Sequence, residues 1–267
     1  MSKAYWVVTH PLTYRVTEPI INAAFQKLDY DGEYDSFDIP TEGLEDVVNK
    51  VRSGELSGLS VFTPHKGPSV DLCDVVSDEI RAIGAVNYMQ MEEGKLVAYN
   101  LDWEGALRAI KSALPDLSGK HILVLGAGGA GRAVAYYGLK EGAKVTIWNR
   151  SPEKAKKFAE EAGMDWVEHV DSLADSPHII VNATRVSSQD RQRSLLPYQL
   201  WDQVELAMES VCQSTSLFLE EAKAMNVDHI IRGEDWAAHQ MNSLLRHITG
   251  QEISSEQMHE LVHEVLV

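Results

Sequence analysis

Two hydrophobic patterns alternate along the first hundred residues. Short apolar runs are typical of buried strands, whereas apolar residues three or four positions apart are typical of amphipathic helices. Glycine and proline lie between these segments and mark the turns. The pattern predicts strands at Ala4–Val8, Glu33–Ile39 and Leu59–Phe62, helices at Glu18–Leu28, Leu44–Val51 and Trp103–Leu114, and a hairpin over Val86–Tyr99 that turns at Glu92–Gly94.

The middle of the chain repeats strand, helix and strand more regularly. We predict strands at His121–Leu125, Lys144–Trp148, Trp166–Val167, His178–Val181, Val204–Met208 and His229–Ile231, and helices at Gly129–Lys140, from Ser151 onward, at Asp235–Ile248 and at Ser254–Leu266. This order is typical of a doubly wound parallel sheet, so the sequence predicts an α/β fold of the Rossmann type. No strand follows Asp235–Ile248, and we expect that helix to pack back on the N-terminal part.

Composition narrows the class of protein. Of the 267 residues, 44% are hydrophobic and 24% charged, which is ordinary for a globular protein. No apolar run approaches the ~18 residues of a membrane span, no signal-peptide pattern follows Met1, and the two cysteines are far apart, which together predict a cytoplasmic protein. The net charge of −16 argues against nucleic acid or an anionic membrane as a partner. We expect a monomer or a homodimer.

The turn after His121–Leu125 has the glycine pattern of a dinucleotide site. Gly126, Ala127, Gly128, Gly129, Ala130 and Gly131 fit G-x-G-x-x-G, between an apolar strand and a predicted helix. The first glycine allows a tight turn, and the second lets backbone N–H groups approach a pyrophosphate. The helix N-terminus adds partial positive charge there. We predict that these residues bind a dinucleotide; the alternative is a glycine-rich turn without a ligand.

The residues after the next strand select the cofactor. NAD-binding proteins usually carry Asp or Glu there, which binds the ribose 2′-hydroxyl. This chain has Asn149, Arg150 and Ser151 instead. A guanidinium can pair with a 2′-phosphate, and the amide and the hydroxyl can donate hydrogen bonds to it. The sequence therefore predicts NADP rather than NAD, unless Arg150 is an ordinary solvated surface residue.

Two polar residues with potential chemistry follow strands in the N-terminal part. Lys66 ends Thr63–Lys66, directly after a predicted buried strand, and Asp102 lies between the predicted hairpin and the next helix. A lysine in such a place is commonly a solvated charge, and an aspartate before a helix is commonly an N-cap. Neither residue identifies a catalytic site by itself.

Taken together, six segments resemble the motifs of the shikimate dehydrogenase family, in the family's order and over nearly the whole chain. They are Ser60–Lys66, Ile83–Tyr88, Asn100–Asp102, Gly126–Ala133, Asn149–Ser151 and Asn182–Thr184, and Ile21–Phe25 and His239–Gln240 match the family's first and late helices. The resemblance implies a substrate-binding domain of residues 1–103 with 238–267, and a Rossmann domain of residues 104–237 that binds NADP. It implies reversible hydride transfer that interconverts 3-dehydroshikimate and shikimate, or a closely related small anionic cyclic hydroxy acid.

The resemblance also implies roles for individual residues. Lys66 and Asp102 are the catalytic pair, in which the lysine gives or takes the proton of the reacting hydroxyl and the aspartate holds the ammonium group. The implied substrate-binding residues are Arg15, Thr17, Phe62, Asn87 and Gln240, and Asn182, Thr184 and Gly233 join the cofactor-binding residues.

Three substrate-binding positions depart from the family's pattern. Ungapped alignment puts Arg15 and Thr17 at the family's two pocket serines, and Phe62 at the threonine of N-x-T-x-P-H-K. Arg15 can bind a carboxylate through two hydrogen bonds, although it can also point to solvent. Phe62 removes a hydroxyl partner, which favours a less hydroxylated ligand. Three functions stay open: a shikimate dehydrogenase, a divergent paralogue with little shikimate activity that acts on another ring acid, and a non-catalytic NADP-binding sensor.

One motif indicates different chemistry. His259–His263 fits H-E-x-x-H, in which two histidines one helical turn apart bind zinc. Four residues follow His263, too few for a third downstream ligand, and Met258, Leu261 and Val262 give the helix an ordinary apolar face. We therefore expect no metal site.

Overall fold

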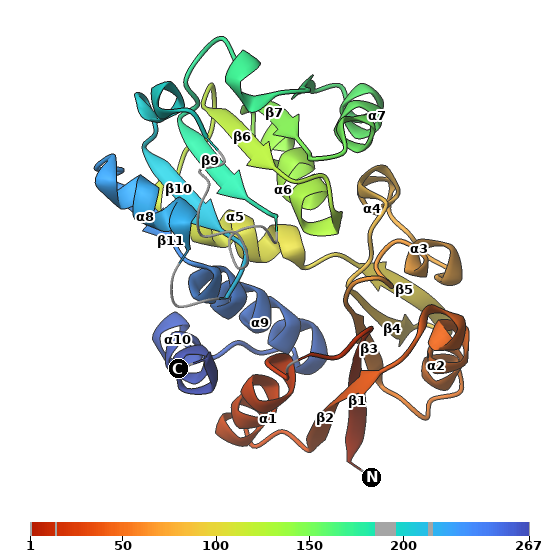
Figure 1. Cartoon of the computed structure of the whole chain (residues 1–267). Helices are drawn as coiled ribbons and strands as arrows, with labels where there is room; N and C mark the ends of the chain where they lie inside the picture. The colour runs from red at the N-terminus through yellow and green to blue at the C-terminus, as the bar shows by residue number, and fades with distance from the viewer. Residues whose placement is uncertain (1, 14, 185–195, 213–215, 267) are drawn as a thin grey trace. The chain divides into compact units, whose positions relative to one another are not determined.

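The computed structural model describes residues 2–13, 15–184, 196–212 and 216–266. The chain forms two compact units, Met1–Glu104 with Gln240–Val267 (the first unit) and Gly105–His239 (the second unit) (Figure 1). Helices α5 (Asp102–Ala113) and α9 (Gly233–Thr249) each contribute residues to both units. The substrate and cofactor roles of the two predicted domains stay predictions at this point.

A five-stranded sheet in the order β2-β1-β3-β4-β5 forms the centre of the first unit. Its strands are β1 (Lys3–Thr9), β2 (Gly32–Asp38), β3 (Gly58–Val61), β4 (Tyr88–Glu92) and β5 (Lys95–Tyr99). The first three are parallel, and β4 and β5 form the predicted antiparallel hairpin. Glu93 and Gly94 close this hairpin with positive φ at both positions, as a two-residue type I′ turn requires.

The topology of this sheet brings distant segments to one edge. Strand β4 is antiparallel to both β3 and β5, so β3 and β5 run in the same direction and end at the same edge. Lys66 follows the end of β3, and Asp102 follows the end of β5. The two residues therefore leave the sheet on the same side, although 35 residues of chain lie between them.

Five helices complete the first unit beside its part of α9. They are α1 (Thr17–Lys27), α2 (Leu44–Arg52), α3 (Ser69–Leu72), α4 (Asp78–Ile83) and α10 (Ser255–Leu266), and α10 packs against α1. The helices α3 and α4 were not predicted. They have four and six residues, fewer than two helical turns, so hydrophobic periodicity cannot reveal them.

The second unit contains a parallel six-stranded sheet in the order β11-β10-β9-β6-β7-β8. Its strands are β6 (His121–Leu125), β7 (Lys144–Trp148), β8 (Asp165–Val167), β9 (Ile179–Asn182), β10 (Leu206–Glu209) and β11 (His229–Ile231). This is the doubly wound order. Successive strands are added in one direction from β6 to β8 and in the opposite direction from β9 to β11, which confirms the predicted fold. In such sheets a dinucleotide binds at the carboxyl ends of the two strands at the reversal.

Helices α6 (Gly129–Lys140), α7 (Pro152–Ala162) and α8 (Leu217–Ala224) belong to the second unit. Every residue of β6, β9 and β10 is buried, which explains why these strands are nearly continuous apolar runs in the sequence. Helix α8 was not predicted, although Ser216 caps it by accepting a hydrogen bond from Leu219 N at 3.3 Å.

No helix in the described ranges combines the length and the apolar character that crossing a membrane requires. Among the same residues, no group of three or more His, Cys, Asp or Glu side chains is arranged to hold a metal ion. In the H-E-x-x-H motif on α10, His259 Nδ1 lies 2.7 Å from the carbonyl oxygen of Ser255.

Candidate active site

Lys66 and Asp102 are in direct contact in the first unit. Lys66 Nζ lies 2.7 Å from Asp102 Oδ2, and Gln240 Nε2 donates a hydrogen bond to Asp102 Oδ1 at 2.7 Å. The side chains of Lys66 and Asp102 are 17% and 5% exposed. Their mutual attraction is therefore screened less than that of a surface ion pair. The aspartate thus has a fixed partner at each oxygen.

The segment that carries Lys66 is held in place by its neighbours. The carbonyl oxygen of Lys66 accepts a hydrogen bond from Val86 N at 2.9 Å. His65 is completely buried, and its Nε2 lies 2.8 Å from the carbonyl oxygen of Ile39. Burial lowers the pKa of His65, which favours the neutral ring. Through its contact with Ile39, His65 anchors the segment that carries Lys66.

Two buried asparagines position the start of α5. Asn100 Oδ1 accepts a hydrogen bond from Asp102 N at 3.1 Å, and Asn100 Nδ2 donates to the carbonyl oxygen of Ala85 at 2.9 Å. Asn87 Oδ1 accepts from Leu101 N at 2.7 Å. Asn87 thus has one partner in the chain at its amide oxygen, and its role in binding substrate stays a prediction. Asn100 was not predicted as a site residue, although it lies in the same motif as Asp102.

An aromatic ring lies beside the ammonium group of Lys66. Lys66 Nζ is 5.6 Å from the centroid of the half-buried Phe62 ring, within the range of cation–π attraction. Thr17, the first residue of α1, is 3% exposed. The substrate-binding roles of Phe62 and Thr17 stay predictions, but the position of Phe62 means that it would border any molecule that reaches Lys66.

Arg15 has an ion-pair partner that the sequence analysis missed. Its Nη1 lies 2.6 Å from Glu18 Oε2, and its side chain is 53% exposed. The same oxygen of Glu18 accepts a hydrogen bond from Ser36 N at 3.0 Å. Burial raises the pKa of Glu18, but the bonds from Arg15 and Ser36 outweigh it and the net shift is downward. Glu18 therefore competes with any substrate carboxylate for Arg15.

The glycine turn of the second unit requires its glycines. Gly126 has φ of +110°, and a Cβ there would lie 2.9 Å from the carbonyl oxygen of Ala183. A Cβ at Gly131 would lie 1.9 Å from the carbonyl oxygen of Gly126. At Gly128, in contrast, a Cβ would meet no atom of the described residues within 4 Å, and none of their side chains caps the N-terminus of α6. This open space beside uncapped N–H groups fits a dinucleotide phosphate.

Asn149 has two partners within the chain, and its predicted role in binding the cofactor stays a prediction. Its Oδ1 accepts a hydrogen bond from Ala127 N at 3.0 Å, and its Nδ2 donates to the carbonyl oxygen of Ser151 at 3.0 Å. Asn149 thus ties the glycine turn to the loop after β7, and the second hydrogen of its NH₂ group is the one that could donate to a 2′-phosphate. The Arg150 side chain is exposed and the Ser151 hydroxyl does not cap α7, so these two residues remain candidates for that contact.

The other predicted cofactor residues lie at or just after the carboxyl ends of β9 and β11, which are separated by β10 in the sheet. Asn182 ends β9 and is fully buried, and Thr184 follows it, with its Oγ1 donating to Asn182 Oδ1 at 2.7 Å. Gly233 begins α9, where a Cβ would lie 2.3 Å from the carbonyl oxygen of Val211. Close backbone packing is therefore enough to explain a glycine at 233, and its contact with a cofactor stays a prediction.

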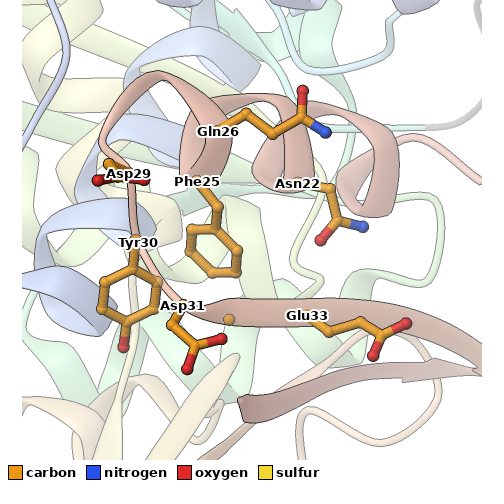
Figure 2. A pocket seen from close by; sticks show the side chains of 8 residues that line it. Asn22, Phe25, Gln26, Asp29, Tyr30, Asp31 and Glu33 are labelled. Atoms are coloured by element: carbon orange, nitrogen blue, oxygen red, sulfur yellow. The ribbon is translucent and has the colours of Figure 1, made fainter.

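A pocket elsewhere in the first unit is unsuited to an acid. Its volume is about 530 Å³, and it lies between α1 and the start of β2 (Figure 2). Because β2, β1 and β3 are parallel, the start of β2 is at the opposite end of these strands from Lys66, which follows β3. Asp29, Asp31 and Glu33 line it, and no lysine or arginine does. An anionic substrate would be repelled there. The candidate active site is therefore the group around Lys66 and Asp102.

Two family models match the chain, in sequence order. Residues 7–89 match the shikimate dehydrogenase substrate binding domain, and residues 108–197 match shikimate / quinate 5-dehydrogenase. The chain is 35% identical to the shikimate dehydrogenase (NADP(+)) of Aquifex aeolicus over 222 residues, which cover 83% of this chain and 82% of the relative.

Solved structures agree with these matches. The crystal structure of shikimate 5-dehydrogenase from Thermus thermophilus, in complex with NADP(H) and shikimate, has a TM-score of 0.88 and 34% identity, and covers 98% of this chain and 99% of that one. A ligand-free 5-ketofructose reductase of Gluconobacter sp. strain CHM43 has a TM-score of 0.86 and 25% identity, and covers 99% of each chain. Proteins of similar architecture thus differ in the substrate for which they are named.

Proposed function

Since this chain belongs to the shikimate dehydrogenase family, we propose that it is an NADP-dependent oxidoreductase that interconverts shikimate and 3-dehydroshikimate, or the corresponding pair of a closely related cyclic hydroxy acid. The observation that carries this proposal is the contact between Lys66 and Asp102, with Gln240 on the second aspartate oxygen. A lysine that is only a solvated surface charge is not expected to pair with a buried carboxylate whose two oxygens both have hydrogen-bond partners.

The proposed mechanism gives the proton to Lys66 and the positioning of Lys66 to Asp102. When bound by the glycine turn, the cofactor would supply the hydride chemistry, with NADP+ as the acceptor and NADPH as the donor. In the oxidation, the neutral amine form of Lys66 takes the proton of the hydroxyl whose carbon loses the hydride and becomes an ammonium group. In the reduction, the ammonium form gives that proton to the oxygen of the carbonyl that gains the hydride. Asp102 keeps the lysine at the reacting oxygen and offsets its charge, and Gln240 fixes the plane of the carboxylate. The hydroxyl of Thr17 and the NH₂ group of Asn87 are proposed to bind the remaining polar groups of the acid.

A second candidate function rests on Phe62 and Arg15. An aromatic ring beside Lys66 cannot accept or donate a conventional hydrogen bond to a neighbouring ring hydroxyl, and Arg15 is already paired with Glu18. Both features favour a divergent paralogue that acts poorly on shikimate and better on a less hydroxylated ring acid. The third candidate is a sensor that binds NADP but catalyses no reaction. It is disfavoured because a protein without a reaction does not require a buried lysine–carboxylate pair such as Lys66–Asp102.

Steady-state kinetics with NADP+ separates the three candidates. Shikimate, quinate and less hydroxylated cyclic acids are offered in turn, and the near-ultraviolet absorbance of the reduced cofactor is followed. A kcat/KM for shikimate of ~10⁴ M⁻¹s⁻¹ or more indicates an ordinary shikimate dehydrogenase. A clear preference for another acid indicates the paralogue. Binding of NADP+ without turnover of any acid indicates the sensor and refutes the proposed activity.

Arg150 is expected to determine the preference for NADP over NAD. Arg150→Met should weaken NADP+ binding about 3- to 10-fold and leave NAD+ binding unchanged, because the lost contact is with the 2′-phosphate and the arginine is solvent-exposed. Titration calorimetry with both dinucleotides measures the two Kd values. Lys144→Met is a matched control, since Lys144 is an exposed cation at the other end of β7. An unchanged NADP+/NAD+ ratio in Arg150→Met would contradict the assignment.

A further inference from the structure

Glu209 is a buried acid that the proposed reaction does not use. It ends β10 and is 1% exposed. Its Oε1 accepts hydrogen bonds from Ser210 N at 3.0 Å and Val211 N at 3.3 Å, and its Oε2 accepts from Asn182 Nδ2 at 3.0 Å and Ser216 Oγ at 2.9 Å. Burial raises the pKa of Glu209, and the four donors oppose the rise. With donors at both oxygens, the side chain acts as an acceptor.

The contact with Glu209 fixes the orientation of the Asn182 amide. A backbone N–H can only donate, and Thr184 N lies 3.1 Å from Asn182 Oδ1, so the amide oxygen must face Thr184. The amide nitrogen then faces Glu209, where a carboxylate oxygen accepts its hydrogen. Two independent contacts therefore require the same orientation, and the opposite one would place an N–H against the N–H of Thr184.

The orientation of Asn182 in turn decides what Thr184 can offer to a ligand. Thr184 Oγ1 lies 2.7 Å from Asn182 Oδ1, which is an acceptor, so the hydroxyl hydrogen of Thr184 is directed to Asn182. Only the lone pairs of Oγ1 remain for another partner. Thr184 also lies against the glycine turn, since a Cβ on Gly126 would be 3.2 Å from Thr184 Cγ2.

We propose that Glu209 is a positioning residue for the cofactor, which through Asn182 makes Thr184 Oγ1 an acceptor for a hydroxyl or amide donor on the nicotinamide half of NADP. The inference rests on the proposed function, because it presupposes that NADP binds. Thr184 follows β9, the first strand of the second mononucleotide-binding half of the sheet, which is the half that faces nicotinamide. A pyrophosphate has acceptors only, so it cannot pair with Thr184 in this state.

The test compares two ligands that differ in the nicotinamide half. Calorimetry on the full-length protein gives Kd for NADP+ and for adenosine 2′,5′-bisphosphate, which lacks that half. Glu209→Gln replaces one acceptor oxygen by NH₂, which removes one of the two contacts that require the same orientation of the Asn182 amide. With only Thr184 N left to orient it, the amide loses its single strongly favoured orientation and Thr184 its fixed direction. We expect Glu209→Gln and Thr184→Val each to weaken NADP+ binding about 3- to 10-fold and to leave the bisphosphate unchanged. The double variant should bind NADP+ no more weakly than Thr184→Val alone.

Controls separate this role from a purely structural one. Thr146→Val removes another buried hydroxyl of the same unit, the partner of His121 Nε2 in the middle of β7, and should leave both Kd values unchanged. Thermal unfolding reports the folding of each variant. If Glu209→Gln does not fold, Asn182→Ala breaks the same link and should give the same loss for NADP+ alone.

Three results would overturn the inference: an unchanged Kd for NADP+ in Glu209→Gln, an equal loss for the bisphosphate, or fully additive losses in the double variant. Failure of the unsubstituted protein to bind NADP+ is a different result, and it would refute the proposed function.

Discussion

Lys66→Met should lower kcat by about 10²–10⁴-fold and leave the Kd for NADP+ essentially unchanged. Methionine retains most of the side-chain volume but cannot take or return the proton of the reacting hydroxyl. It also leaves the 5%-exposed Asp102 without its cation, 2.7 Å from where the ammonium was. Steady-state kinetics in both directions, together with calorimetry for NADP+, separates the loss of chemistry from any loss of cofactor binding.

Lys50 provides a matched control for this substitution. Like Lys66, it is in the first unit, is paired with a carboxylate, that of Glu55, and has its Nζ 5.6 Å from the centroid of an aromatic ring, that of Trp6. Unlike Lys66, it lies on the exposed side of α2, so Lys50→Met should retain kcat. Full kcat in Lys66→Met would show that Lys66 is not the proton-transfer group. An equal loss of kcat in both variants would point to a general effect of removing a charge.

Phe62→Thr should raise kcat/KM for shikimate, relative to a less hydroxylated analogue, by about 10- to 100-fold. Threonine supplies a hydroxyl where the ring now borders Lys66, so a ring hydroxyl of the substrate gains a partner. The analogue that lacks that hydroxyl gains nothing and loses apolar contact with the ring. Competition between the two acids in one reaction mixture measures the ratio directly.

Phe37 is the corresponding control. It is a half-buried phenylalanine of the same unit whose ring centroid lies 4.0 Å from that of Trp6, away from Lys66. Phe37→Thr should lower the thermal unfolding midpoint and leave the substrate ratio as it is. If Phe62→Thr behaves in the same way, Phe62 is a packing residue and the argument for a less hydroxylated substrate fails.

The local sequence pattern was sufficient for the most regular part of the fold. The predicted limits of β6, α6 and β7 agree with the structure because Gly126–Gly131 and Gly142 interrupt runs that are buried on both sides. The short helices α3 and α4 were missed because too few residues repeat for a period to show. Helix α8 has eight residues and was also missed, because about two helical turns repeat the pattern of its buried face, Phe218, Leu219 and Ala222, too few times.

For the candidate site, the sequence indicated which residues take part but not which groups they pair with. The motif order indicated Lys66, Asp102 and Gln240. In the structure, Lys66 and Gln240 each form a hydrogen bond with one carboxylate oxygen of Asp102. The partners of Arg15, Asn149 and Asn182 were not foreseen. Each depends on a side chain or backbone group from another segment, and hydrophobic periodicity carries no information about such pairings.

Residue order alone therefore determined the alternation of strands and helices, the glycine turn and the family, because these follow from contacts between neighbours in the chain and from backbone conformations that only glycine adopts freely. Folding in three dimensions decided which polar groups pair with one another. Glu18 pairs with Arg15, the side chain of Asn149 joins two loops, and Asn182 donates to Glu209. A buried donor or acceptor must find a partner, and which partner is within reach depends on the packing of segments that are far apart in the sequence.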